Sequence, residues 1–370
     1  MSRLFSPITV RDLTLPNRIM VSPMCQYSAE QGRATAWHMM HLPNLAISGA
    51  GLLGIEATAV EADGRITHED LGLYDDATEA ALKPVIDSVH RYGQSAVVIQ
   101  LAHAGRKASS YPPWEGGQLR PVSDRGWRPV APSAVPYKDG EPAPVALDQD
   151  GMVRIRDSFA MATRRADRLG IDAIELHGAH GYLLHQFMSP LSNQRTDSYG
   201  GSLENRIRYP LEVFDAIRAA FPAGKPVGVR LSATDWVAGG WDLEQAIVLA
   251  RALKARGADW IDVSSGGLSP LQKIPLGPGY QVPFAERIKR EAGVTTIAVG
   301  LITEPRQAEE IVHSGKADLV AIARGMLFDP RWGWHAAAAL GATVDAPPQY
   351  WRALPREQAK LFRQVVNGSR

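Results

Sequence analysis

The sequence predicts an α/β protein built on a closed (β/α)₈ barrel, the TIM-barrel fold. Short apolar runs suited to strands alternate with longer segments of helical periodicity over most of the 370 residues. Several of the short runs are apolar almost throughout, which is typical of parallel strands covered on both faces. Eight strand-then-helix units follow one another, whereas the alternative, an open doubly wound sheet, uses fewer strands.

The individual elements follow in chain order. A β-hairpin over Ile8–Val10 and Leu13–Leu15 is expected to precede the barrel. The barrel strands are expected at residues 19–21, 52–57, 96–101, 173–176, 227–231, 260–263, 296–299 and 319–323. The helices that follow them are expected near residues 38–48, 78–92, 152–169, 203–220, 243–256, 282–292, 305–314 and 332–340.

The chain is longer than the roughly 250 residues typical of such a barrel. Prolines recur through residues 102–150 and exclude a long helix or a central strand there. We therefore expect a long loop excursion after the third strand, and a C-terminal extension over residues 342–370. No linker divides the chain, so residues 1–370 are expected to form a single domain.

Composition excludes several classes of function. The 40 basic and 39 acidic side chains leave a net charge of +1, which gives no general attraction to nucleic acid or to an anionic membrane. No apolar run approaches the roughly 20 residues that span a bilayer, and the first residues do not resemble a signal peptide. Cys25 is the only cysteine, which rules out an intrachain disulfide or an iron–sulfur cluster. We expect a cytoplasmic protein with no nucleic-acid or membrane partner.

Candidate site residues follow the predicted strands, at the end where barrel enzymes hold their chemistry. Cys25 lies in the segment Pro23–Tyr27 directly after the first strand, where a buried turn cysteine is the alternative. Gln100 ends the third strand and brings an amide that needs partners, from water, from backbone or from the polar edge of a heterocycle. Arg230 ends the fifth strand, and its guanidinium requires an anionic or electron-rich partner there.

His177, His180 and Tyr182 follow the fourth strand within a glycine-containing turn. The two imidazoles fit a pair of hydrogen-bond donors to an oxygen atom, with the phenol as a proton source. The alternative is that the two histidines only cap the loop. A metal-assisted hydrolase that adds a carboxylate such as Asp235 is a further alternative. Because no His-x-His or His-Glu-x-x-His pattern supplies the missing ligands, no metal site is predicted.

Two glycine patterns bear on phosphate binding. Gly49–Gly54 matches G-x-G-x-x-G, but a helix precedes it and a strand follows, the reverse of a dinucleotide-binding turn, so we interpret it as a helix end. Gly300 and the segment Ala323–Gly325 follow the seventh and eighth strands, where barrels often bind phosphate. Arg324 would reinforce such a site.

Together these residues resemble the old yellow enzyme family of flavin-dependent ene-reductases, and within it the bacterial group typified by YqjM and xenobiotic reductase A. The resemblance covers essentially the whole chain. The segments that carry it are Ser22–Tyr27, Gln100–Arg106, His177–Tyr182 and the polar loop Asn193–Arg206.

The resemblance implies a (β/α)₈ barrel that binds FMN non-covalently at its mouth. Pro23, Met24 and Ala57 would line the ring, Gln100 and Arg230 would contact its pyrimidine end, and Gly300, Ala323 and Arg324 would hold the phosphate. Cys25, where other members carry threonine, would tune the flavin's redox behaviour. The implied cofactor-binding set is Ser22, Pro23, Met24, Cys25, Ala57, Gln100, Arg230, Gly300, Ala323 and Arg324.

On the substrate side, the resemblance implies that His177 and His180 bind the carbonyl or nitro oxygen of an activated alkene. Tyr182 would supply the proton, solvent being the alternative, and Tyr27 would flank the substrate. Arg352 is the counterpart of an arginine that enters a neighbouring subunit's site, although a solvated tail arginine is the alternative.

The implied enzyme is an NADPH dehydrogenase or ene-reductase that transfers hydride from NADPH or NADH through FMN to a C=C bond. A homodimer or homotetramer is expected, with Trp332, Trp334 and Trp351 as interface or core residues. Dienoyl-CoA reductases and amine dehydrogenases share the barrel, but one cysteine cannot supply the iron–sulfur cluster that they carry. A non-catalytic scaffold is less favoured, because the polar candidates gather after strand ends.

Overall fold

The computed structural model describes residues 2–363 and contains a closed barrel of eight parallel strands. The strands follow one another around the barrel in chain order, and the last pairs with the first. They are β3 (Ile19–Val21), β4 (Leu52–Ala59), β5 (Ala96–Ala102), β8 (Ala173–Gly178), β9 (Val227–Ser232), β10 (Trp260–Ser264), β11 (Thr295–Ala298) and β12 (Leu319–Ile322). The predicted (β/α)₈ fold is confirmed.

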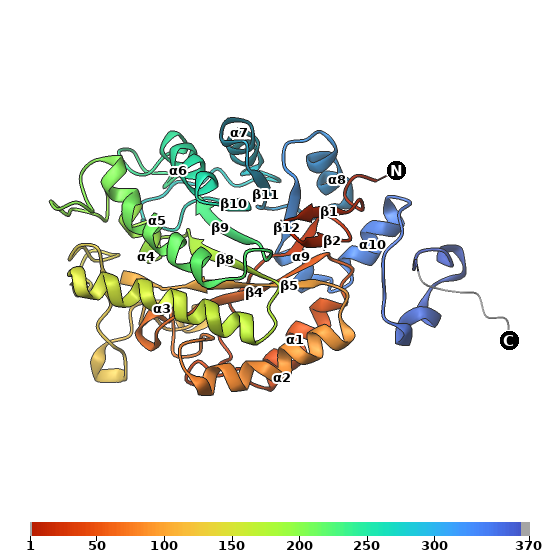
Figure 1. Ribbon diagram of the computed structural model, residues 1–370, viewed down its shortest axis with the longest axis horizontal. Coiled ribbons are helices and arrows are strands. Elements are labelled where there is room, and N and C mark those ends of the chain that lie inside the picture. The colour runs from red at the N-terminus through yellow and green to blue at the C-terminus, as the bar shows by residue number, and fades with distance from the viewer. Residues whose placement is uncertain (1, 364–370) are drawn as a thin grey trace.

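Helices surround the strands, as Figure 1 shows. The long ones lie within three residues of their predicted bounds: α1 (Ala36–Ala46), α2 (Asp76–Tyr92), α3 (Gln149–Arg168), α5 (Leu203–Ala220), α6 (Leu243–Ala255), α7 (Val282–Ala292), α8 (Pro305–His313) and α10 (Trp332–Ala339). Two short helices, α4 (Leu183–Met188) and α9 (Arg324–Phe328), were not predicted. Both begin directly after residues of the predicted site.

Side-chain caps fix where several helices begin. Asp75, Asp148, Ser202 and Asp242 each accept a hydrogen bond from the backbone N–H three residues later, at the starts of α2, α3, α5 and α6. The glycine-rich segment after α1 connects that helix to β4, which confirms the helix-end interpretation of Gly49–Gly54. Each cap thus sets where the loop that leads from the barrel mouth ends.

The strands begin at an end of the barrel that is closed by apolar packing. The predicted hairpin, β1 (Ile8–Val10) and β2 (Leu13–Leu15), lies there. Leu15 packs in one cluster with Met20, Leu52 and Trp260 from the barrel strands. Because this end is filled, a ligand can enter only from the opposite, C-terminal end of the strands.

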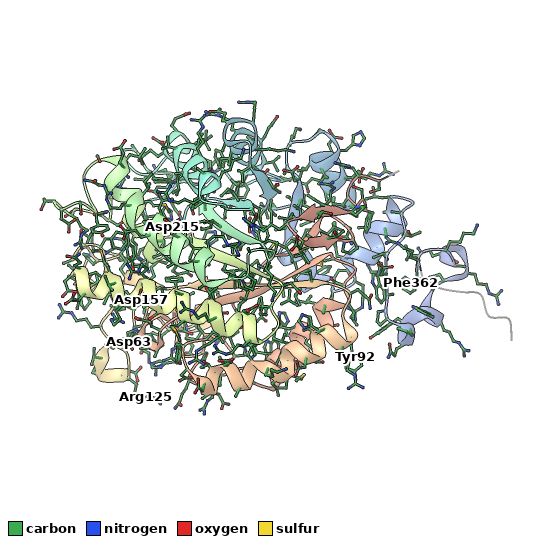
Figure 2. All side chains as sticks on the ribbon, viewed as in Figure 1. Asp63, Tyr92, Arg125, Asp157, Asp215 and Phe362 are labelled. Carbon is green, nitrogen blue, oxygen red and sulfur yellow. The ribbon has the colours of Figure 1, made fainter. Side chains whose placement is uncertain are left out.

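The excursion and the C-terminal extension lie at opposite ends of the molecule's long axis, yellow and blue in Figure 1. The excursion contains only short elements: η2 (Gly105–Lys107), η3 (Pro113–Glu115), η4 (Val122–Asp124), β6 (Val130–Ala131) and β7 (Val145–Ala146). In Figure 2 the label Arg125 marks the end of the molecule where the excursion lies, and the label Phe362 marks the end where the extension lies. The extension includes η5 (Pro348–Ala353) and η6 (Arg356–Gln358); residues 364–370 of its predicted range lie outside the described residues.

Among the described residues, no helix has both the length and the apolar character that crossing a bilayer requires.

Candidate active site

Four polar side chains form a layer across the barrel interior below its mouth. Strand register places Gln100 beside Glu175 and Arg230 beside Asp262. The Gln100 side-chain N–H donates to Glu175 Oε1 at 2.8 Å, and Trp260 Nε1–H donates to Glu175 Oε2 at 3.2 Å. All four side chains of the layer are buried, so the floor of the mouth is both polar and shielded from water.

The charges in this floor are mutually dependent. Burial and the Asp262 carboxylate raise the pKa of Glu175, and burial raises the pKa of Asp262. Arg230 Nε lies 3.3 Å from Asp262 Oδ2, yet no atom of the described residues accepts a hydrogen bond from it. The guanidinium therefore retains hydrogen-bonding capacity for an electron-rich group above the floor.

Gln100 and Arg230 each lie two residues before the end of their strand. The predicted strands ended at residues 101 and 231, and the observed strands continue one residue further, β5 to Ala102 and β9 to Ser232. The strands extend because pairing between neighbouring strands continues past both residues. Both side chains thus belong to strands, which hold them more rigidly than loops would.

A cavity of about 150 Å³ lies beside this floor, after β11 and β12. Gly300, Ala323 and Arg324 line it, as predicted for the phosphate end of the site. Gly300 has φ +119°, and a Cβ at that position would lie 2.6 Å from Gln281 Nε2, so the turn requires glycine. A cationic side chain beside such a glycine turn suits a phosphate group.

The loop after β3 forms another wall. Ser22 is buried and Cys25 is a free thiol that is partly exposed. Gly54 on β4 has no side chain, which leaves room for the Pro23 ring. Burial and the nearby Asp70 and Glu56 carboxylates raise the pKa of the Cys25 thiol, so the thiol stays protonated at neutral pH.

Tyr27 connects this loop to the excursion. Its ring meets Trp114 edge to face, with the centroids 5.5 Å apart, and Trp114 is 66% exposed. Burial raises the pKa of Tyr27, so its phenol stays neutral. Met24 is half-buried beside the core, and Ala57 is buried on β4.

His177, His180 and Tyr182 converge at the mouth as predicted. The His177 ring lies 5.2 Å from the His180 ring and 5.0 Å from the Tyr182 ring, edge to face in both cases. The Ala179 backbone N–H donates to His177 Nδ1, which leaves the proton of a neutral His177 on Nε2. His180 Nε2 lies 2.7 Å from Ser264 Oγ.

Both imidazoles are held neutral. Burial, followed by the positive charge of Arg230, lowers the pKa of His177 and of His180 well below 6.5. Burial raises the pKa of Tyr182 well above 10, so the phenol keeps its proton. The cluster is therefore a set of neutral N–H and O–H groups, the form that donates hydrogen bonds to an oxygen atom.

A left-handed turn positions this cluster. His180 has φ +58° and Gly181 has φ +73°. The ammonium of Lys107, from the excursion, donates to the carbonyl oxygens of His180 and Gly267 at 2.9 and 3.1 Å. It also lies 4.9 Å from the centroid of the Tyr182 ring, and burial lowers its pKa to about 8.

In the structure Asp235 is not placed to join His177 and His180 in the metal site that the hydrolase alternative requires. Asp235 accepts hydrogen bonds from His185 Nε2 at 2.7 Å and from Ser189 Oγ at 2.6 Å, and so it does not serve His177 or His180. Within residues 2–363, no cluster of three or more His, Cys, Asp and Glu side chains is arranged to bind a metal. The sequence suggested Asp235 only because it could not show that His185 would pair with it.

Sequence reasoning missed Lys107, Glu175, Asp262 and Ser264. Glu175 had a signal, because a carboxylate two residues before His177 in an apolar strand must share the interior face with it. Asp262 lies in a similar apolar strand, β10. The roles of Lys107 and Ser264 depend on contacts between loops that follow different strands, which no local pattern reveals.

Arg352 belongs to η5 of the C-terminal extension, at the end of the molecule opposite the excursion. It is exposed on the C-terminal extension, whose Tyr350 ring packs 5.5 Å from the Trp334 ring of α10. Trp332 and Trp334 are buried within the chain, and Trp351 Nε1–H donates to the backbone of Ala346. In this chain the three tryptophans are used for internal packing.

The mouth thus fits a planar group with hydrogen-bond acceptors at one end and a phosphate at the other. The model of the NADH:flavin oxidoreductase / NADH oxidase family matches residues 3–341. The chain belongs to this family. An NADPH dehydrogenase of Geobacillus thermodenitrificans is 45% identical over 351 residues, which cover 94% of this chain and 98% of the relative. An NADPH dehydrogenase of Listeria innocua is 45% identical over 355 residues, 95% of this chain and 99% of the relative.

Solved structures agree with the family assignment. Morphinone reductase superposes with a TM-score of 0.75 at 29% identity, over 94% of this chain and 92% of that one. An old yellow enzyme homologue from Zymomonas mobilis gives 0.75 at 26% identity, over 93% and 94% of the two chains. The chain is thus an FMN-dependent NAD(P)H oxidoreductase of the old yellow enzyme type, as the sequence analysis expected.

Proposed function

We propose that the protein is an ene-reductase that reduces the C=C bond of α,β-unsaturated carbonyl or nitro compounds. The observation that carries this proposal is the pair of neutral imidazoles, the buried His177 and the half-buried His180, beside the phenol of Tyr182. FMN, when bound, accepts hydride from NADPH or NADH and passes it to the alkene. The protein's own task is to hold, polarise and protonate the substrate.

The residues at the mouth would hold the cofactor without a covalent bond. Arg230 and Gln100 offer hydrogen bonds from the floor to the pyrimidine end of the ring. The cavity lined by Gly300, Ala323 and Arg324 would receive the phosphate. The remaining wall would consist of Ser22, Pro23, Met24, Cys25 and Ala57, with the protonated Cys25 thiol beside the ring.

The two histidines would bind the oxygen of the substrate's activating group. His177 has its proton on Nε2, and His180 becomes the second donor when its Nε2 turns from Ser264 to the substrate. Negative charge grows on that oxygen as the alkene accepts hydride, so the two hydrogen bonds strengthen toward the transition state. A donor of this kind is worth about 10²- to 10³-fold in rate.

Tyr182 would then protonate the α-carbon, with solvent as the alternative donor, while Tyr27 flanks the substrate from the opposite loop. Tyr182 keeps its proton at neutral pH, and the Lys107 ammonium close to its ring would stabilise the phenolate left behind. The proton would be replaced from solvent before the next turnover.

We propose in addition that the enzyme is a cytoplasmic homodimer or homotetramer. Arg352 lies on the extension at the end of the molecule opposite the excursion, so it can reach a mouth only in another copy of the chain. There its guanidinium would contact the substrate.

The proposal is tested by the double variant His177→Ala/His180→Ala. Reoxidation of the reduced enzyme by cyclohexenone should slow by at least about 10²-fold. Reoxidation by molecular oxygen, which needs no oxygen clamp, should change little, and the visible spectrum should show that FMN remains bound. His313→Ala removes an exposed imidazole and serves as the control. Unchanged enone reduction in the double variant contradicts the assignment.

A further inference from the structure

A second cavity, of about 580 Å³, opens on the same end of the barrel and is lined by four arginines. Arg33 comes from the loop after β3, Arg65 from the loop after β4, and Arg120 and Arg125 from the excursion after β5. Three segments that are distant in sequence thus bring guanidinium groups to one hollow. Figure 2 shows Arg125 at the excursion's end of the molecule.

The hydrogen bonds that Arg33 and Arg65 make do not neutralise their positive charge. Arg33 donates to the Glu30 carbonyl and the Gln31 side chain, and Arg65 donates to the carbonyls of Ala62 and His68. All of these acceptors are neutral.

Carboxylates near the cavity neutralise only part of this charge. Arg120 pairs with Asp124 at 3.4 Å, whereas no ion pair within 4 Å involves Arg125 in the described part of the chain. Glu30 and Glu69 also line the cavity, but neither forms an ion pair among the described residues. The hollow therefore carries an excess of positive charge.

His68 gives an independent sign of a missing partner. Its Nε2 is buried in the wall of this cavity and makes no hydrogen bond of ordinary geometry among residues 2–363, although the nearby Arg125 backbone acts to raise the pKa of the ring. The ring is fixed edge to face on Trp127 at 4.9 Å, with Arg65 5.4 Å above the same indole. Burial and the charge of Arg120 lower the pKa of His68, as expected in a cationic hollow. A buried polar atom without a partner is costly unless a ligand or water satisfies it.

The cavity adjoins the mouth through the loops that the two sites share. Tyr27 lies two residues before Ala29, which lines the cavity, and Asp70 lies two residues after His68. The Ala29 backbone N–H donates to the Glu69 carbonyl oxygen at 2.8 Å, which joins the loop that carries Tyr27 to the segment that carries His68.

We propose that the arginine cavity binds the phosphorylated adenosine end of the nicotinamide dinucleotide and makes the enzyme prefer NADPH to NADH. The inference rests on the proposed function, which brings the nicotinamide ring to the mouth. The rest of the dinucleotide carries a pyrophosphate, and in NADPH a further phosphate, which must lie outside the mouth. Arginine binds phosphate through paired N–H groups, and the arginine-lined hollow next to the mouth supplies them.

The double variant Arg33→Gln/Arg125→Gln tests the site, because both side chains are exposed and neither pairs with a carboxylate in the described chain. In the holoenzyme, the Kd of adenosine 2′,5′-bisphosphate, measured by calorimetry, should rise at least about tenfold. The Kd for NADPH in anaerobic flavin reduction should rise similarly, and that for NADH by less. Arg91→Gln/Arg164→Gln is the matched control: it removes the same charge from exposed sites on α2 and α3 and should change neither constant.

The outcomes separate this inference from the proposed function. Equal losses in the two double variants, or an unchanged Kd for both probes, would overturn the dinucleotide site. A weaker Kd for an anionic alkene alone, measured with dithionite-reduced enzyme, would also overturn it and assign the cavity to the substrate. If neither dinucleotide reduces the wild-type flavin, the proposed function itself fails.

Discussion

Gly181 offers a sharp test of how the backbone positions the catalytic cluster. It lies between His180 and Tyr182 and has φ +73°. A Cβ placed there would lie 2.7 Å from the Gly267 carbonyl carbon and from Leu268 Cα, and closer still to the Gly267 carbonyl oxygen. All three obstacles are atoms of the main chain, which cannot turn aside as a side chain can. Gly181→Ala must therefore move the loop.

The size of the effect follows from this geometry. Restoring an ordinary contact of 3.4 Å to the two carbon atoms needs a shift of at least about 0.7 Å, and the closer Gly267 oxygen requires a larger one, of about 1 Å. A misplacement of about 1 Å can cost about 10²-fold in rate, so we expect enone reduction to fall by about 10- to 100-fold, or about 1.4–2.7 kcal/mol in the barrier. The left-handed backbone adds a loss of stability of about 1–2 kcal/mol.

Gly239→Ala separates strain from displacement. Gly239 has φ +74°, but a Cβ there would meet nothing within 4 Å. It should lose the same stability from the left-handed conformation and keep its rate of enone reduction within about twofold. Stopped-flow reoxidation by cyclohexenone gives the rates, the visible spectrum gives the FMN content, and urea unfolding gives the stability. Full activity in Gly181→Ala, or an equal loss in both variants, would refute the reasoning.

Three further predictions follow from the site. Burial lowers the pKa of His177 and His180, so below pH 6.5 the unfolded chain takes up protons on these imidazoles and the folded chain does not. The free energy of unfolding should therefore decrease, as the pH is lowered below 6.5, by about 1.4 kcal/mol per pH unit for each imidazole. Urea unfolding of His177→Ala/His180→Ala should show a smaller decrease over the same pH range. Lys107→Met leaves two loop carbonyls without their donor, so unfolding free energy in urea should drop by about 1–3 kcal/mol, and a stability equal to wild type would contradict this. Gly300→Ala should weaken FMN binding to the apoprotein at least about tenfold in a fluorescence titration, while Gly315→Ala, in open space with φ +78°, should leave it unchanged.

The elements of the fold were predictable because their signals are local. Barrel strands carry continuous apolar runs, and the long helices carry apolar periodicity with a cap at the start of several. The short helix α4 escaped because its 6 residues, Leu183–Met188, are too few to show a helical period, and all of them are buried, the polar His185 and Gln186 included. Its sequence is therefore as consistent with a buried strand as with a helix.

The site was predictable where one strand end supplies each residue. His177, Arg230 and Arg324 each follow or end an apolar run, and barrel geometry brings strand ends together. Pairings between segments were not predictable in this way. Strand register pairs Gln100 with Glu175, and loop packing brings Lys107 to the carbonyl of His180. Neither relation leaves a trace in the spacing of residues along the chain.

The central claim is that the barrel mouth holds a flavin that exchanges hydride between a nicotinamide dinucleotide and an activated alkene. The most direct measurement is the visible spectrum of the purified protein during anaerobic titration, first with NADPH and then with cyclohexenone. We predict a yellow protein that releases FMN on denaturation, loses its colour with NADPH and regains it with the enone. A colourless protein that takes up no FMN, or a reduced flavin that the enone leaves unchanged, would contradict the account.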